Sequence, residues 1–329
     1  MKHSEILISV KHLKKWFPVR TGIFSMLFRK KLWIRAVDDI SFNIKKGEVL
    51  CLVGESGCGK TTTARVILRL EKPTAGMATF KGKNIFTLNK SELKKLRTKM
   101  QIIFQDPYAS MNPRMTVFDI VAEPLKVHRI ASGEELKDRV INTLESVGLT
   151  PPETFLTRYP HELSGGQRQR VGIARALILK PEFIVADEPV SMVDVSLRAG
   201  ILNLMLDLQE KYDLTYLFIT HNLAQARYVG DRVAVMYLGK IMELGPVEKT
   251  LREPKHPYTK ALISHVPIPD PEAVRERLRL KGEIQTPINP PSGCRLHPRC
   301  PYAMEKCRIE EPEFAEVEKD HFVACHLVF

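Results

Sequence analysis

Two stretches near the start of the chain place apolar residues at alternating positions. They are Ile6–Val10 and the set Ile40, Phe42 and Ile44. Alternation is typical of a strand with one buried face. Four other segments are continuously apolar, which favours strands buried on both faces of a parallel sheet. These segments are Val49–Val53, Ile102–Phe104, Phe183–Ala186 and Tyr216–Ile219.

Helical patterns lie between the apolar runs. Leu136, Val140 and Leu144 recur every fourth residue, and a second set follows a 4-3-4 spacing. The second set is Leu197, Ile201, Leu204 and Leu208. Strands that alternate with helices predict an α/β sheet whose ligands bind at the carboxyl ends of the strands. Residues 115–180 have helical patterns almost throughout, and we interpret them as an inserted helical subdomain.

After about residue 245 prolines accumulate, which favours an extended, loop-rich appendage. We therefore predict a core at 1–114 and 181–245, a helical subdomain at 115–180, and an appendage at 246–329. Residues 20–35 mix basic and apolar residues without a period. They are interpreted either as a segment that contacts a membrane or partner, or as a surface insertion.

The bulk properties are those of a globular protein with a sizeable core. The chain has 329 residues, 44% of them hydrophobic and 27% charged, with a net charge of +12. No apolar run approaches the roughly 18 to 20 residues that span a bilayer, and the first residues lack a secretory signal. We expect a protein that stays inside the cell. Residues 1–35 carry nine Lys or Arg, and Glu5 is their one acidic residue. We interpret this positive charge as serving solubility or docking at a membrane partner rather than binding of nucleic acid, since no nucleic-acid motif accompanies it.

A glycine-rich segment follows the Val49–Val53 run directly. GESGCGKT at Gly54–Thr61 matches the phosphate-binding loop, in which backbone N–H groups and a helix N-terminus cradle phosphate oxygens. Lys60 would bridge the β- and γ-phosphates of ATP, and the Thr61 hydroxyl would ligate Mg²⁺. The alternative is a purely structural turn. The candidate nucleotide contacts are Gly54, Glu55, Ser56, Gly57, Cys58, Gly59, Lys60, Thr61 and Thr62.

Two carboxylates end another apolar run, Phe183–Ala186. Asp187 is placed to hold Mg²⁺ directly or through water, and Glu188 to polarise the attacking water. Paired acids at a strand end are alternatively only solvated. The nearby phosphate-binding loop favours the functional interpretation.

A second glycine-containing helix start lies at LSGGQRQR, Leu163–Arg170. Ser164 is a natural N-cap, and Gly165 and Gly166 would expose backbone N–H groups as a second anion-binding nest. One chain needs only one nest for one triphosphate. The second nest therefore suggests the γ-phosphate of a nucleotide bound by a partner subunit.

These motifs resemble those of the ABC ATPases, whose signature is LSGGQ, here ending at Gln167. The resemblance covers residues 5–245 and implies an ABC-type P-loop ATPase core, an antiparallel β subdomain and a helical subdomain. It implies that Gln105 senses Mg²⁺, that Asp194 acts across a dimer, and that His221 contacts the γ-phosphate. His221 is alternatively a strand-end histidine with satisfied hydrogen bonds. The resemblance places Phe17 against adenine, with Trp16 or a plain core role for Phe17 as alternatives.

Three features narrow the resemblance to the ATPase subunits of oligopeptide/dipeptide-type importers, some of which import nickel or oligosaccharides. These are QDPYASMNPRMTV at Gln105–Val117, HPYTKAL at His256–Leu262, and a cysteine-rich end. The resemblance implies ATP, Mg²⁺, and a cytoplasmic-face location. It implies a second, homologous ATPase subunit, two permease subunits and an extracytoplasmic solute-binding protein. Rival hypotheses are a soluble ABC ATPase acting on nucleic acid and a non-hydrolysing regulatory subunit.

Four cysteines crowd the end of the chain at Cys294, Cys300, Cys307 and Cys325. Their spacing lacks the paired knuckles of zinc modules, and a reducing cytosol disfavours disulfides. Irregular spacing on a proline-rich loop suits a [4Fe–4S] cluster, which the resemblance also implies. Zinc in the same pocket and four free thiols remain alternatives. Cys51 and Cys58 are interpreted as packing residues.

Overall fold

The computed structural model describes residues 5–19, 32–266, 278–283 and 285–328. They form two compact units. Unit 1 is built mainly from Thr87–Ile219, and unit 2 from the described residues of 6–44, 49–86 and 220–329. This grouping places the described part of the C-terminal residues 246–329 in one unit with the first strands; the domain bounds predicted from the sequence stay a prediction. Most of residues 20–35 lies outside the described residues.

An antiparallel sheet in unit 2 contains the strands expected from the alternating pattern. Its order is β2-β1-β4-β5, and Ile40, Phe42 and Ile44 are buried in β2 as predicted. The strands are β1 (Ile6–Pro18), β2 (Trp33–Lys45), β4 (Ala75–Phe80) and β5 (Lys83–Asn84). A bulge interrupts the pairing of β1 with β4 between Lys11 and Lys14.

A second set of strands in unit 2 follows the order β11-β12-β10-β9-β3. These are β3 (Val49–Val53), β9 (Arg232–Tyr237), β10 (Lys240–Pro246), β11 (Ala315–Glu318) and β12 (His321–Val323). Only β3 and β9 pair in parallel, and every residue of β3 is buried. β12 pairs with β10 through Glu243↔Val323. The loop-rich appendage predicted from its prolines therefore also contributes two strands, which the proline pattern did not indicate.

Short helices complete unit 2. They are α1 (Lys60–Ile67), α8 (Leu223–Val229), α9 (Val247–Arg252), α10 (Pro257–Ser264) and α11 (Glu305–Ile309). Asn222 caps α8 with its side chain, and His256 caps α10 in the same way. Pro257 occupies the first position of α10, where its missing N–H costs no hydrogen bond.

Unit 1 contains three parallel strands in the order β8-β7-β6. They are β6 (Met100–Ile103), β7 (Phe183–Asp187) and β8 (Thr215–Thr220). All residues of β7 and β8 are buried, which confirms the prediction made from their apolar runs. β6 is only half buried, whereas the apolar run Ile102–Phe104 predicted a strand buried on both faces.

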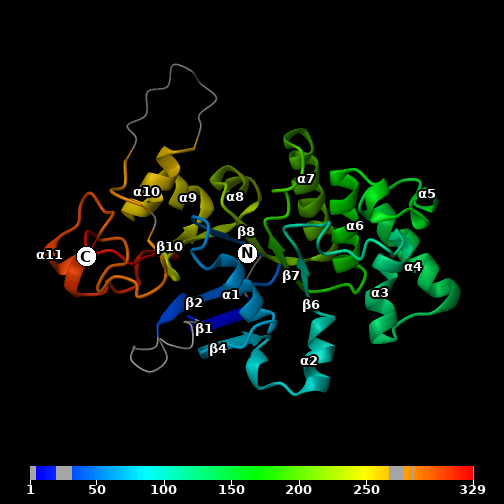
Figure 1. The fold of residues 1–329 in the computed structure, drawn as a ribbon, viewed down its shortest axis with the longest axis horizontal. Helices are drawn as coiled ribbons and strands as arrows, with labels where there is room; N and C mark the ends of the chain where they lie inside the picture. The colour runs from blue at the N-terminus through cyan, green and yellow to red at the C-terminus, as the bar shows by residue number, and fades with distance from the viewer. Residues whose placement is uncertain (1–4, 20–31, 267–277, 284, 329) are drawn as a thin grey trace, which may run out of the picture. The chain divides into compact units, whose positions relative to one another are not determined.

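Three helices of unit 1, α3, α4 and α7, contact α6, and Figure 1 shows α3 to α6 as one group. The helices are α2 (Lys90–Arg97), α3 (Val117–His128), α4 (Gly133–Ser146), α5 (Glu153–Leu156), α6 (Gly165–Leu177) and α7 (Val195–Tyr212). Leu136, Val140 and Leu144 form the buried stripe of α4, as predicted. Leu197 of α7 is instead 44% exposed. No helix among the described residues is long and apolar enough to cross a membrane.

Candidate functional site

The glycine-rich loop lies between β3 and α1, as the sequence predicts. Gly54 and Gly59 have φ of +151° and +111°, a region that favours glycine. A Cβ at Gly54 would overlap the Met236 carbonyl oxygen, and one at Gly59 would overlap that of Ala36. These glycines are therefore required both by the backbone conformation and by close approach of neighbouring backbone.

Lys60 points into the loop that precedes its helix. Its ammonium donates to the carbonyl oxygens of Gly54, at 2.8 Å, and Glu55, at 3.0 Å. The residue is only 5% exposed. A buried cation at the start of a helix, inside a turn of backbone N–H groups, is a site for phosphate oxygens.

The two aromatic candidates for stacking on adenine differ in their contacts. The Trp16 indole donates to Asp38 Oδ1 at 2.9 Å, and the Arg35 guanidinium lies 4.7 Å from its ring centroid. The Phe17 ring has the Lys15 ammonium 4.5 Å away. Trp16 is thus anchored by a hydrogen bond to a buried carboxylate. The assignment of Phe17 to adenine stays a prediction.

His221 immediately precedes α8 and is exposed. Asn222 beside it accepts hydrogen bonds from the amides of Ala224 and Gln225 and so fixes the start of the helix. The exposed position suits a histidine that contacts a ligand, and its role stays a prediction.

Unit 1 brings two predicted site residues together. The Gln105 amide donates to Glu188 Oε2 at 3.1 Å. Glu188 follows β7 with φ of +47°, and its amide donates to the Ile219 carbonyl at 2.9 Å. The left-handed conformation is sparsely populated by residues with a Cβ and is often found at functional sites. Asp187 before it is 5% exposed at the end of the strand.

The second nest forms the N-terminus of α6. Ser164 Oγ accepts from the Gln167 amide at 3.2 Å, and Gln167 Oε1 accepts from the Ser164 amide at 3.0 Å. This capping box confirms Ser164 as the N-cap. Ser164 is exposed. A Cβ at Gly166 would lie 3.2 Å from Leu197 Cδ1, so the nest and the start of α7 share one surface.

Asp194 is the N-cap residue of α7, and its side chain makes no capping hydrogen bond. It is exposed, and apolar neighbours on both sides are exposed too. Met192 is 60% exposed, Val195 76% and Leu197 44%. Three exposed apolar side chains beside the predicted anion-binding nest are typical of a surface that a partner covers.

The four C-terminal cysteines are all buried, with between 7% and 9% of each residue exposed. Burial, with smaller contributions from the other three cysteines, raises the pKa of Cys294 to about 12. The Cys294 amide donates to the Cys307 carbonyl at 2.8 Å. None of the four forms a disulfide. No group of three or more His, Cys, Asp or Glu side chains in the described part of the chain has an arrangement that could hold a metal ion.

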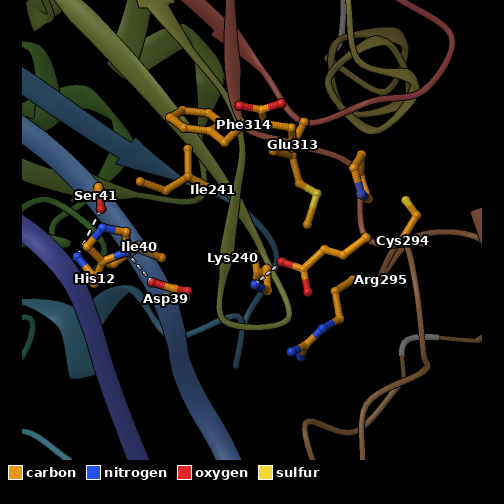
Figure 2. Close-up of a pocket in the computed structure, with 14 residues that line it drawn as sticks. His12, Asp39, Ile40, Ser41, Lys240, Ile241, Cys294, Arg295, Glu313 and Phe314 are labelled. Atoms are coloured by element: carbon orange, nitrogen blue, oxygen red, sulfur yellow. Dashed lines mark hydrogen bonds and ion pairs between the residues drawn. The ribbon is translucent and has the colours of Figure 1, made fainter. Parts of the chain in front are cut away.

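A cavity of ≈ 510 Å³ lies beside Cys294 in unit 2 (Figure 2). Its charged side chains pair with carboxylates: His12 Nδ1 lies 2.9 Å from Asp39 Oδ1, and Lys240 pairs with Glu311. Since these groups are already paired, the cavity has no evident preference for a cation or an anion. It does leave space next to a cysteine.

Sequence reasoning missed the C-terminal residues that contact the nucleotide-binding motifs. Arg295 pairs with Asp38, the carboxylate that also binds Trp16. Arg299 pairs with Glu55 of the glycine-rich loop. The sequence does mark these arginines by their position, because Arg295 follows Cys294 and Arg299 precedes Cys300.

The fold and the glycine-rich loop define an ABC-type ATP-binding cassette, and comparison with known proteins agrees. Residues 37–191 match the ABC transporter family, and residues 242–307 match the oligopeptide/dipeptide transporter C-terminal region. The cassette MJ0796, solved as a dimer in a post-hydrolysis state with ADP and Pi, is 31% identical. The likeness has a TM-score of 0.64 and covers 73% of this chain and 99% of that one.

Curated relatives are similar over nearly the whole chain. The oligopeptide transport ATP-binding protein AppF of Bacillus subtilis is 51% identical over 99% of this chain and 98% of its own length. The probable peptide ABC transporter ATP-binding protein y4tS of Sinorhizobium fredii is 47% identical over 98% of this chain and 90% of its own length. The chain therefore belongs to the ABC transporter ATP-binding proteins, in the branch with the oligopeptide/dipeptide transporter C-terminal region. The predicted ABC-type ATPase and its fold are confirmed, and no match supports a function on nucleic acid.

Proposed function

We propose that this chain hydrolyses ATP to power the import of oligopeptides or dipeptides. The observation that carries the proposal is the N-terminus of α6, where Ser164 is exposed and Gly166 lies next to Leu197 of α7, the helix whose N-cap residue is the exposed Asp194. A second nest in the same chain suits the triphosphate bound by another subunit. The peptide substrate is inferred from relatives that are named as oligopeptide or peptide transport proteins.

The proposed catalytic roles are those that the sequence motifs imply for each group. Lys60 would neutralise the β- and γ-phosphates, and His221 would contact the γ-phosphate. Glu188 would orient and polarise the attacking water, held in place by the hydrogen bond from Gln105. Thr61, Asp187 and Gln105 are the proposed Mg²⁺ contacts. The metal would neutralise charge that develops on the phosphates.

The active form is proposed to be a head-to-tail dimer with a homologous ATPase subunit. Exposed Met192, Val195 and Leu197 supply apolar surface for such an interface next to the nest. The assembly would include two membrane permease subunits and an extracytoplasmic solute-binding protein. This chain would lie on the cytoplasmic face of the membrane through the permeases. Closure on ATP would drive release of the cargo inward.

Uptake by cells tests the substrate class. The native host without this chain should lose uptake of a labelled tripeptide, and the wild-type chain should restore it. The Glu188→Gln variant should restore none, because it lacks the carboxylate that polarises water. Labelled nickel and a labelled oligosaccharide are the comparison solutes. Normal tripeptide uptake in the deletion strain, with loss of a comparison solute, would reject a peptide substrate.

A [4Fe–4S] cluster at Cys294, Cys300, Cys307 and Cys325 is part of the proposal. Burial, with a smaller contribution from neighbouring cysteines, raises the pKa of Cys294, Cys300 and Cys325, so these thiols would be costly as thiolates without a cation between them, and cluster iron supplies that charge. A single zinc ion holds its thiolates at about 2.3 Å and needs them closer together than a four-iron cluster does. The cluster would clasp the loops of the C-terminal segment.

Anaerobic purification tests the cluster. We expect visible absorption typical of iron–sulfur proteins together with bound iron and sulfide, all lost in Cys307→Ser. Cys51→Ala is the matched control, because Cys51 is a buried thiol in β3. Stoichiometric zinc without sulfide, or metal-free protein of full stability, would contradict the cluster.

A further inference from the structure

The C-terminal segment, meaning the described residues of 246–329, contacts Glu55 of the glycine-rich loop. The backbone amide of Glu55 donates to the Tyr258 hydroxyl oxygen at 3.0 Å. The two terminal nitrogens of Arg299 donate to the two carboxylate oxygens of Glu55, at 2.9 and 3.3 Å. Such a forked, charge-assisted pair is both strong and directional. Main chain and side chain of Glu55 are thus each held by the C-terminal segment.

The two groups that hold Glu55 are themselves fixed by packing. Tyr258 is fully buried, and the Arg299 side chain is 9% exposed. The Tyr237 ring lies between them, 4.7 Å from the Tyr258 ring and 5.7 Å from the Arg299 guanidinium. An ion pair with this little exposure is only weakly screened by solvent. The contact is therefore less screened than the exposed ion pairs elsewhere on the C-terminal segment.

Glu55 also positions the phosphate-binding lysine. Its carbonyl oxygen accepts from Lys60 Nζ at 3.0 Å, next to the Gly54 carbonyl at 2.8 Å. A displacement of the Glu55 backbone would move one of the two carbonyl groups that orient Lys60. It would also change the curvature of the loop whose N–H groups face phosphate.

We propose that Tyr258 and Arg299 are positioning residues for ATP binding: they hold Glu55 so that the glycine-rich loop is preorganised for the triphosphate. The proposal rests on the proposed ATPase function and adds that the C-terminal segment contributes to nucleotide affinity. Preorganisation lowers the entropy that binding must overcome, so its loss weakens affinity. The groups that act on the attacking water lie elsewhere. The loss therefore raises KM and leaves kcat near the parent value.

The test uses the full-length protein and three variants at these positions. Tyr258→Phe removes only the hydroxyl group. Arg299→Gln removes the positive charge and the paired hydrogen bonds of the guanidinium to Glu55. Each should raise the Kd of a fluorescent ATP analogue with Mg²⁺ about ten-fold, which is the expected effect of losing a charge-assisted or buried hydrogen bond. Arg299→Lys keeps the charge without the fork and should recover part of the affinity. Arg308→Gln is the control, because Arg308 forms only an exposed ion pair with Glu305.

Two further measurements separate positioning from a general loss of structure. The Glu55→Gln and Arg299→Gln substitutions should be strongly non-additive in Kd, since both break the same pair. The thermal midpoint of Tyr258→Phe identifies any affinity loss that comes from unfolding. Folded variants with the Kd of the parent would overturn the proposal, as would a fall in kcat at unchanged KM. ATP hydrolysis by the parent tests the proposed function separately, because the positioning effect is measured in binding.

Discussion

Glu243 offers the sharpest test of how the C-terminal segment is attached. The residue is fully buried on β10, and its Oε1 accepts from His321 Nε2 and from the Lys255 amide, each at 2.8 Å. Its Oε2 accepts from the His256 amide at 3.1 Å. Glu243→Gln leaves one oxygen and one NH₂ group to face three donors. Removing one partner of a buried ionic group costs about 3–5 kcal/mol.

Thermal unfolding followed by circular dichroism measures this cost. At roughly 2–4 °C per kcal/mol for a unit of this size, the midpoint should fall by about 10 °C. The control is Glu316→Gln, an exposed carboxylate that accepts a single backbone hydrogen bond from Asp320, and its midpoint should stay within about 2 °C of the parent. Equal midpoints for Glu243→Gln and the parent would refute the buried network as the attachment.

Two further predictions concern the loop and pH. Gly54→Ala should abolish binding of an ATP analogue, because the new Cβ would overlap the Met236 carbonyl. The control is Gly82→Ala, whose Cβ meets open space at φ +76° and should cost only about 1–2 kcal/mol of stability. Equal binding by both variants would contradict this prediction. Burial lowers the pKa of His256 to about 4 from its usual 6.5, so between these values the unfolded chain binds a proton that the native state excludes. The free energy of unfolding should therefore fall by up to roughly 3 kcal/mol as pH drops through this window. His256→Asn keeps a capping oxygen for the Tyr258 amide, and its free energy of unfolding, measured by denaturant titration, should depend less on pH than that of the parent. The same pH dependence in the variant and the parent would contradict the role given to His256.

The parts predicted well from the sequence are those set by local patterns. The Val49–Val53 run predicted a strand buried on both faces, and all of its residues are buried. Ser164 predicted a helix start, and the structure has Ser164 as the N-cap of α6, in a capping box with Gln167. Both signals depend only on residues close together in the chain, where periodicity and capping chemistry act.

The parts not predicted are contacts between distant residues. Arg299 and Glu55 are 244 residues apart, and nothing in either neighbourhood indicates the other. The strand His321–Val323 has three residues, too few for a period, and it is held by pairing with β10 and by the buried Glu243. A buried carboxylate has no sequence pattern of its own, because its environment is built by other segments.

Sedimentation of the Glu188→Gln variant tests the central claim most directly. With ATP and Mg²⁺, alone or together with its homologous partner subunit, the variant should bind nucleotide, hydrolyse it at least about 100-fold more slowly than the parent, and accumulate as a dimer. Ser164→Arg in the same background should keep nucleotide binding and remain monomeric, because it blocks the nest that completes the other subunit's site. A nucleotide-loaded Glu188→Gln protein that stays monomeric in both settings, or a dimer that Ser164→Arg leaves intact, would contradict the account.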